Sequence, residues 1–166
     1  MTAARHQIKR YQIGFAAFFC LALAPGLSAP VFGGAPTELI VVDWHTGLAI
    51  GGYDPVAFYT EGMPVPGSAD FELPYRGTVW RFANFGNREA FKANPDTYMP
   101  QFGGYDPLGV AHGVAVPGNV GVWLIAGGRL FLFYDRGRRE AFAADAERIL
   151  AAAERKWPDV ASALTP

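Results

Sequence analysis

The sequence predicts an α+β protein with a small antiparallel sheet of two hairpins, short helices and an amphipathic C-terminal helix. Apolar residues alternate or run continuously on either side of glycine-containing turns at 71–82 and 122–134, which is typical of β-hairpins. Near the end of the chain, apolar residues recur at helical spacing between charged ones. Because strands and helices do not alternate strictly, the α+β class is favoured over a parallel α/β sheet.

Residues 1–29 are predicted to be a secretory signal peptide. Three basic residues precede an apolar run at 13–24, and small residues follow, which is the order of regions in such peptides. The run of about 12 residues is shorter than the roughly 20 that cross a bilayer as a helix. We therefore expect a periplasmic or secreted protein. The alternative is a chain anchored by an uncleaved N-terminal helix, since Pro30 is an unfavourable neighbour for cleavage.

The predicted mature chain is mildly acidic. Three of the 14 basic residues lie in the leader, so 11 remain against 15 acidic ones and the net charge falls from −1 to −4. Without a Lys/Arg cluster, such a domain is a poor electrostatic match for nucleic acid. Cys20 is the only cysteine and lies in the leader, so we expect neither a disulfide nor a thiolate metal site in the mature chain.

After the leader, the chain is predicted to form one domain without a membrane span. Residues 30–44 begin with a stretch rich in Gly, Ala and Pro and are predicted to be a flexible lead-in. Residues 45–160 form the domain, and residues 161–166 form a tail.

The two hairpins differ in their expected surroundings. Pro74 cannot donate a ladder hydrogen bond, so the first strand of the hairpin at 71–82 is predicted to be an edge. The hairpin at 122–134 turns at Gly127-Gly128, which suits the positive φ angles of a two-residue turn. Its strands are apolar on both faces, which predicts central, buried strands. Four aromatic residues at strand spacing are predicted to be core: Trp80, Phe82, Phe131 and Phe133.

Two helices are predicted around and after these hairpins. Asn84 can cap a helix that runs to Ala93, and Pro95 follows its end. Phe91 is expected to be its core contact. A second helix is indicated by apolar residues at helical spacing: Phe142, Ala146, Ile149, Leu150, Ala153 and Trp157. Pro158 is predicted to stop it.

A segment of seven residues, Gly-Gly-Tyr-Asp-Pro-Val-Ala at 51–57, recurs almost unchanged at 103–109. In one interpretation both copies are the same local device: the glycines permit an unusual backbone, Asp caps the next turn and Pro takes the first helical position. In the other, the two turns form one ligand pocket. Its wall would consist of Tyr53, Asp54, Tyr105 and Asp106, with His112 nearby.

Several motifs occur in an order that resembles a known family. They are the segments 52–59, 67–71, 80–83, 87–91 and 100–105, followed by 130–134 and 157–158. Together they resemble the exported bacterial YHS-domain proteins over roughly residues 45–160. The resemblance implies kinship with small metal-binding modules in which cysteines are the expected ligands. Many exported YHS proteins have a cysteine after the second Gly-Gly-Tyr, where this chain has Asp106, so the soft ligand that favours copper(I) or zinc is missing.

Imidazole and carboxylate groups remain as candidate metal ligands. They are His45, Asp54, Asp106 and His112. Such a set suits a divalent metal such as copper or zinc. Its spacing does not match a strong metal signature, and ordinary surface histidines are the alternative interpretation.

The sequence favours a non-catalytic function. The predicted mature chain has no cysteine nucleophile, no Gly-x-Ser-x-Gly elbow and no phosphate-binding glycine loop. We therefore expect a binding module for a metal ion or small ligand. The alternative is a scaffold or partner-binding protein without a small ligand, in which the Pro74 edge strand or the apolar loop 114–118 presents a docking surface to an unknown protein.

Overall fold

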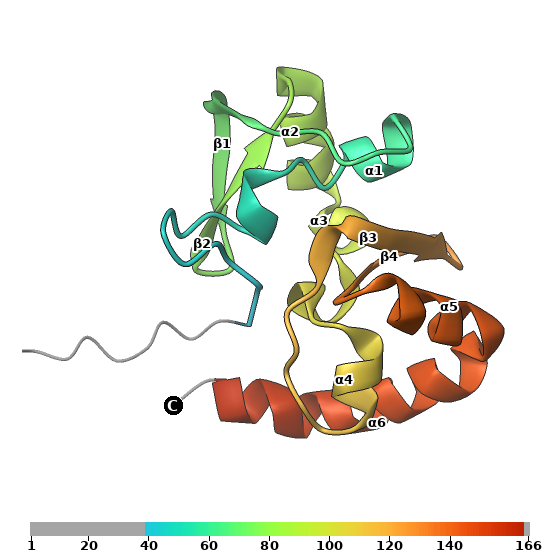
Figure 1. The fold of residues 1–166 in the computed structure, drawn as a ribbon. Helices are drawn as coiled ribbons and strands as arrows, with labels where there is room; N and C mark the ends of the chain where they lie inside the picture. Colours follow the sequence, from blue (N-terminus) through green and yellow to red (C-terminus); the bar gives the residue numbers. More distant parts are fainter. Residues whose placement is uncertain (1–38, 165–166) are drawn as a thin grey trace, which may run out of the picture. The chain divides into compact units, whose positions relative to one another are not determined.

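The computed structural model describes residues 39–164. Short helices, two antiparallel two-stranded sheets and a long C-terminal helix make up this part of the chain (Figure 1), which confirms the α+β class. In chain order the elements are η1 (Ile50–Gly52), α1 (Ala57–Thr60), β1 (Ser68–Tyr75), β2 (Thr78–Phe82), α2 (Phe85–Ala93), α3 (Pro95–Tyr98), η2 (Gln101–Gly104), α4 (Pro107–Ala111), β3 (Asn119–Ala126), β4 (Arg129–Phe133), α5 (Arg136–Ala144) and α6 (Ala146–Leu164). The predicted signal peptide lies outside the described residues. Within 39–164, no helix has the length and apolar character that crossing a membrane requires.

The second half of the described chain repeats the element order of the first. Each half consists of a 3₁₀ turn, a short helix, a hairpin and two further helices; we call them the first repeat (residues 50–98) and the second repeat (residues 101–164). Even the irregularities agree, because the strand register shifts between Ser68 and Glu72 in one hairpin and between Asn119 and Trp123 in the other. The fold is therefore a tandem duplication of one module.

The printed sequence carries this duplication beyond the recurring Gly-Gly-Tyr-Asp-Pro segment. Arg-Glu-Ala-Phe at 88–91 returns at 139–142, and Phe82 corresponds to Phe133 at the same offset. A tandem repeat is recognised in a sequence when similar residues recur at a fixed spacing. The duplication can therefore be read from the sequence itself, and the recurring segment before each short helix is one part of it.

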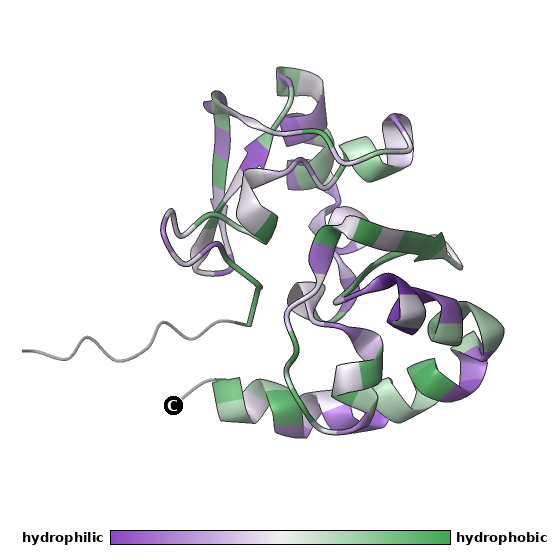
Figure 2. Cartoon of the chain, viewed as in Figure 1, coloured by the Kyte–Doolittle hydropathy of each residue, from purple (hydrophilic) through white to green (hydrophobic). Residues whose placement is uncertain are grey.

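The second hairpin separates the two hydrophobic core clusters. Alternate residues of β4 point to opposite faces: Leu130 and Leu132 pack in the first cluster, and Phe131 and Phe133 pack in the second. Figure 2 shows β3 as hydrophobic along most of its length. Burial on both faces was predicted and is confirmed. The prediction of central strands is wrong. A central strand is hydrogen-bonded to a strand on each side, whereas β3 and β4 pair only with each other in a two-stranded sheet.

The first hairpin has one face on the core. Trp80 and Phe82 of β2 are fully buried, as predicted. Outside the hairpin, β2 makes a parallel bridge from Val79 to Leu48, whereas β1 pairs with β2 alone among the described strands. Pro74 therefore lies on an edge strand, as its missing N–H predicts.

Helix α2 follows the prediction closely. The Asn84 side chain accepts a hydrogen bond from the Asn87 N–H at 2.8 Å, which satisfies one of the free N–H groups of the first turn. The helix ends at Ala93, two residues before Pro95. Phe91 is fully buried and contacts both Trp80 and Phe82.

The C-terminal helix differs from the prediction in two ways. Its apolar pattern is divided between α5 and α6, with Asp145 in a non-helical conformation between them. Pro158 does not stop α6, which continues to Leu164, so most of the predicted tail is helical. A proline inside a helix removes one hydrogen bond and crowds the preceding turn. On either side of Pro158, Trp157 is partly buried against the second core cluster and Val160 is buried. These contacts, together with the packing of α6 along α4 (Figure 1), hold the helix together across this defect.

The end of the predicted lead-in is part of the fold. Ile40 is buried, the Val41 N–H donates to the Gly103 carbonyl at 2.8 Å, and the Val41 carbonyl accepts from the Ile50 N–H at 2.8 Å. The segment 39–42 thus connects the 3₁₀ turns of the two repeats. The structure therefore differs from the prediction of a flexible segment up to residue 44; residues 30–38 lie outside the described part.

Candidate functional site

The pairs Gly51-Gly52 and Gly103-Gly104 lie in turns with a left-handed backbone conformation. The φ angles are positive throughout, from 42° to 76° over residues 50–52 and from 54° to 92° over residues 102–104. Glycine adopts such angles at little cost. At Gly103 a side chain is excluded for a second reason, because a Cβ atom would lie 1.8 Å from the Leu39 carbonyl oxygen. The glycines are therefore explained by backbone geometry.

Asp54 ties the first turn to the hairpin and helix that follow it. The carboxylate is fully buried and accepts four hydrogen bonds. Two come from the N–H groups of Val56 and Ala57, at 2.8 and 3.3 Å. The other two come from the Ala83 N–H at 2.8 Å and the Asn87 side-chain amide at 2.6 Å. The buried charge is thus compensated by donors from three segments of the first repeat.

Asp106 does the same in the second repeat. It is also fully buried and accepts from the N–H groups of Gly109 and Tyr134, each at 2.9 Å. Arg138 replaces the asparagine of the first repeat and forms an ion pair with the carboxylate at 3.2 Å. The two aspartates are equivalent structural residues, as the first interpretation of the recurring segment predicts.

The four predicted pocket residues are divided between the two repeats. Each aspartate is engaged within its own repeat. Tyr53 packs against the first core cluster, and Tyr105 belongs to the second, where it lies against Trp157. None of these four residues lines any of the cavities described for residues 39–164.

The predicted metal ligands are not assembled either. Among the described residues, no three His, Cys, Asp or Glu side chains gather to hold a metal ion. His45 lies in an exposed turn that Asp43 closes, and hydrogen bonds from the backbone and hydroxyl of Thr46 hold the pKa of that carboxyl below its ordinary value. His112 ends α4, with Nδ1 at 2.6 Å from the Leu108 carbonyl oxygen. Asp106 and His112 thus lie at opposite ends of α4, while His45 and Asp54 lie in two other turns, so the four side chains do not gather at one site.

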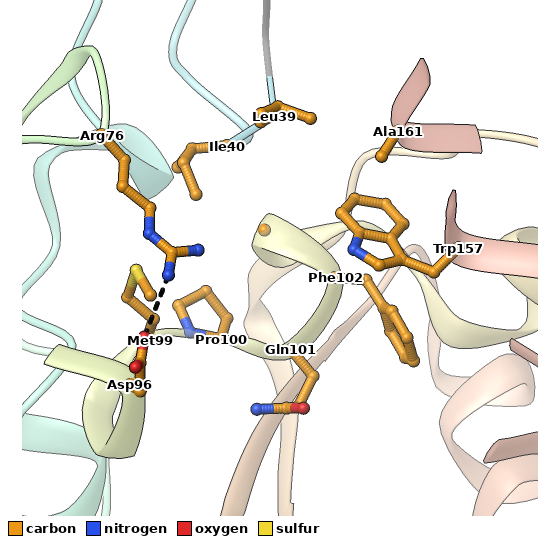
Figure 3. A pocket seen from close by; sticks show the side chains of 11 residues that line it. Leu39, Ile40, Arg76, Asp96, Met99, Pro100, Gln101, Phe102, Trp157 and Ala161 are labelled. Atoms are coloured by element: carbon orange, nitrogen blue, oxygen red, sulfur yellow. Dashed lines mark hydrogen bonds and ion pairs between the residues drawn. The ribbon is translucent and has the colours of Figure 1, made fainter. Parts of the chain in front are cut away.

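A cavity of about 330 Å³ opens beside the second left-handed turn. Figure 3 shows Trp157 and Phe102 on one side, and Arg76 with Asp96 on the other. The indole and phenyl rings meet edge to face with their centroids 5.6 Å apart. The lining residues are Leu39, Ile40, Arg76, Asp96, Met99, Pro100, Gln101, Phe102, Gly103, Trp157 and Ala161. The cavity thus combines an apolar, aromatic wall with a few polar groups, as small-molecule sites commonly do.

Arg76 has an unusual backbone conformation. It occupies the first of the two turn positions between β1 and β2 with φ of 50°, where the second hairpin has Gly127 with φ of 57°. A left-handed conformation costs a residue other than glycine about 1–2 kcal/mol. The ion pair from Arg76 Nη2 to Asp96 Oδ1 measures 3.1 Å, but both side chains are more than half exposed, and such pairs contribute about 0.2–1 kcal/mol. The ion pair alone does not offset the backbone cost.

A second cavity, of about 300 Å³, lies among α4, α5 and α6. Its lining is mostly alanine and aliphatic side chains, with His112 and Arg148 as its polar members. Arg148 is ion-paired with Asp145. His112 is thus the one predicted site residue that lines a described cavity.

Sequence reasoning missed the cavity beside η2 because its residues come from distant positions. Arg76 and Trp157 lie in different repeats, and no spacing rule relates them. One local signal was present: Arg76-Gly77 occupies the turn between two strands where an asparagine, aspartate or glycine is usual. Comparison with known proteins finds no family model, curated protein or solved structure that matches this chain.

Proposed function

We propose that this protein is a non-catalytic binding module that takes a small organic ligand in the cavity between η2 and α6. The observation that carries the proposal is the lining: Trp157, Phe102 and Met99 offer apolar surface, while Arg76 and Gln101 offer hydrogen-bond donors. A volume of about 330 Å³ is at the lower end for ligand sites, which favours a ligand with one or two rings.

The YHS resemblance concerns the structural framework of the protein, not the cavity. The motifs that resemble the family include the Gly-Gly-Tyr-Asp-Pro turns, strand β2 and helix α2, and most of these features are common to the two repeats. We propose that the chain is an exported YHS-like protein built from two copies of this module, with export inferred from the signal-peptide pattern at 1–29. The framework motifs do not specify a ligand; the residues around the cavity would.

A small organic ligand is favoured over a metal ion because the carboxylates of Asp54 and Asp106 are already occupied by hydrogen bonds within the protein. Asp54 and Asp106 already accept hydrogen bonds from at least three groups each. A metal would have to replace those bonds inside the core, where unpaired N–H groups are costly. The same engagement argues against either carboxylate acting as a catalytic acid or base.

Filling the cavity should abolish binding of a bicyclic probe. The probes are 1-naphthylacetate and its neutral analogue 1-naphthylacetamide, titrated by isothermal calorimetry. We expect saturable one-to-one binding by the wild type and none by Ala161→Phe, whose new ring would occupy the cavity beside Trp157. Ala151→Phe is the matched control, because residue 151 lies on an exposed part of the same helix. Failure of both probes to bind the wild type at about 1 mM, which corresponds to about −4 kcal/mol, would reject the proposal.

A second candidate function, binding of a partner protein, is favoured by one observation. Trp44 is 82% exposed, and its ring lies against His45 in a tight turn. Exposed tryptophans are enriched among residues that dominate protein interfaces. If this function holds, a protein captured from a periplasmic extract by the wild type should be lost with Trp44→Ala and retained with Phe85→Ala, another exposed aromatic residue. Equal capture by both variants would exclude a role for Trp44.

A further inference from the structure

We propose that the ligand of this cavity is a carboxylate attached to an apolar ring system, with Arg76 as the residue that selects the negative charge. This inference rests on the proposed function and specifies its ligand class. The ring system would lie against Trp157 and Phe102, and the carboxylate would lie against the guanidinium.

The two hairpin turns differ at the position of Arg76. The second hairpin turns on Gly127 and Gly128, whereas the first has an arginine at the equivalent left-handed position. The module therefore does not require a side chain there, and a glycine would relax the backbone. Strained residues that the local fold does not require are concentrated at ligand sites. Arg76 is one of the two non-glycine residues with positive φ that line this cavity; the other, Phe102, corresponds to Ile50 and belongs to the turn that both repeats contain.

The Arg76 side chain lies along the cavity. Figure 3 shows the Arg76 side chain extending along one side of the cavity, with its guanidinium pointing to Asp96 and the Trp157 ring on the far side. The ion pair to Asp96 uses Nη2. A guanidinium carries five N–H donors in a planar fork that matches a carboxylate. It can therefore bind a ligand carboxylate while remaining near Asp96.

Asp96 is the competing anion at this site. Its side chain is 80% exposed, so solvent weakens the pair and a ligand carboxylate can share the guanidinium with Asp96. The position is acidic in both repeats, since Asp96 and Glu147 each lie in the first turn of the corresponding helix. An acid there is favourable for the helix itself. Of this ion pair, the acid is therefore common to both repeats, whereas the arginine is present in the first repeat alone, where the second has Gly127.

The charge preference can be measured with the two naphthyl probes, which share their rings and differ in charge. We expect the wild type to bind 1-naphthylacetate about tenfold more tightly than 1-naphthylacetamide, because a hydrogen bond to a charged group is the stronger one. Arg76→Gly should bring this ratio close to one, and its melting temperature should rise because the turn is relaxed. Asp96→Asn should change acetate affinity in the opposite direction, by a few-fold increase, because a competing charge is removed.

The outcomes separate the inference from the proposed function. Equal affinity of the wild type for both probes, or an unchanged preference in Arg76→Gly, would overturn the role of Arg76 while the cavity remained a binding site. Absence of binding by both probes would reject the proposed function. Circular dichroism of each variant checks that the fold is intact.

Discussion

Asp54→Ala should lower the free energy of unfolding by about 3 kcal/mol or more. The variant removes the acceptor for three backbone N–H groups and one amide, all inside the first repeat. A buried donor left without a partner costs about 1–3 kcal/mol, and water entering the small space would recover part of that loss. The measurement is urea-induced unfolding followed by circular dichroism.

Asp159→Ala provides the control for this loss. Asp159 is exposed on α6, and a surface substitution of this kind changes stability by about 0.5 kcal/mol or less. A loss for Asp54→Ala no larger than that of the control would contradict the structural role of the carboxylate. Asp106→Ala should behave like Asp54→Ala, because it removes the acceptor for two backbone N–H groups and leaves the Arg138 charge without its partner.

Phe142→Ala should lower the free energy of unfolding by about 3–5 kcal/mol, the usual range for removal of a buried phenyl ring. The side chain is fully buried, and its ring lies 4.9 Å from that of Phe131 and 5.3 Å from that of Phe133. The ring attaches α5 to the face of β4 that belongs to the second core cluster. Its removal leaves a void between two structural elements.

Phe85→Ala is the matched control for this substitution. Phe85 is 58% exposed at the start of α2, and its ring contacts only the Arg88 guanidinium among the ring and cation contacts described. We expect a loss of no more than about 1 kcal/mol. Because Phe91 corresponds to Phe142 in the first repeat, Phe91→Ala should match the larger value. Losses that differ between Phe91→Ala and Phe142→Ala by more than twofold would show that the two repeats are not energetically equivalent.

Local chemistry explains why several elements could be predicted. The helix that begins after Asn84 depends on a side chain three residues from its hydrogen-bond donor, and the second hairpin depends on two adjacent glycines at its turn. Each signal lies within a few residues of the structure that it determines. The same holds for the recurring Tyr-Asp-Pro segment, whose aspartates each bond to the N–H groups two or three residues ahead.

Predictions that required long-range contacts were less successful. Pro158 has a strong local tendency to end a helix, yet α6 passes through it because Trp157 and Val160 are packed on the rest of the fold. Residues 30–44 are predicted to be a flexible lead-in from the Gly-, Ala- and Pro-rich stretch at their start, but Val41 is hydrogen-bonded to both repeats. In both cases contacts from distant parts of the chain outweigh the local preference.

The sequence by itself determined the α+β class and the two hairpins, because these follow from periodicity and from turn residues close to the strands. It left two interpretations of Asp54 and Asp106 open, and the long-range hydrogen bonds of the tertiary structure decided for the structural one. The pairing of the two repeats around a hairpin that is buried on both faces was decided by tertiary structure. Tertiary structure also decided the cavity that Arg76 and Trp157 line together. The physical reason is that its walls are contributed by residues far apart in the chain, and burial and packing, which act between such residues, have no signature within a short segment.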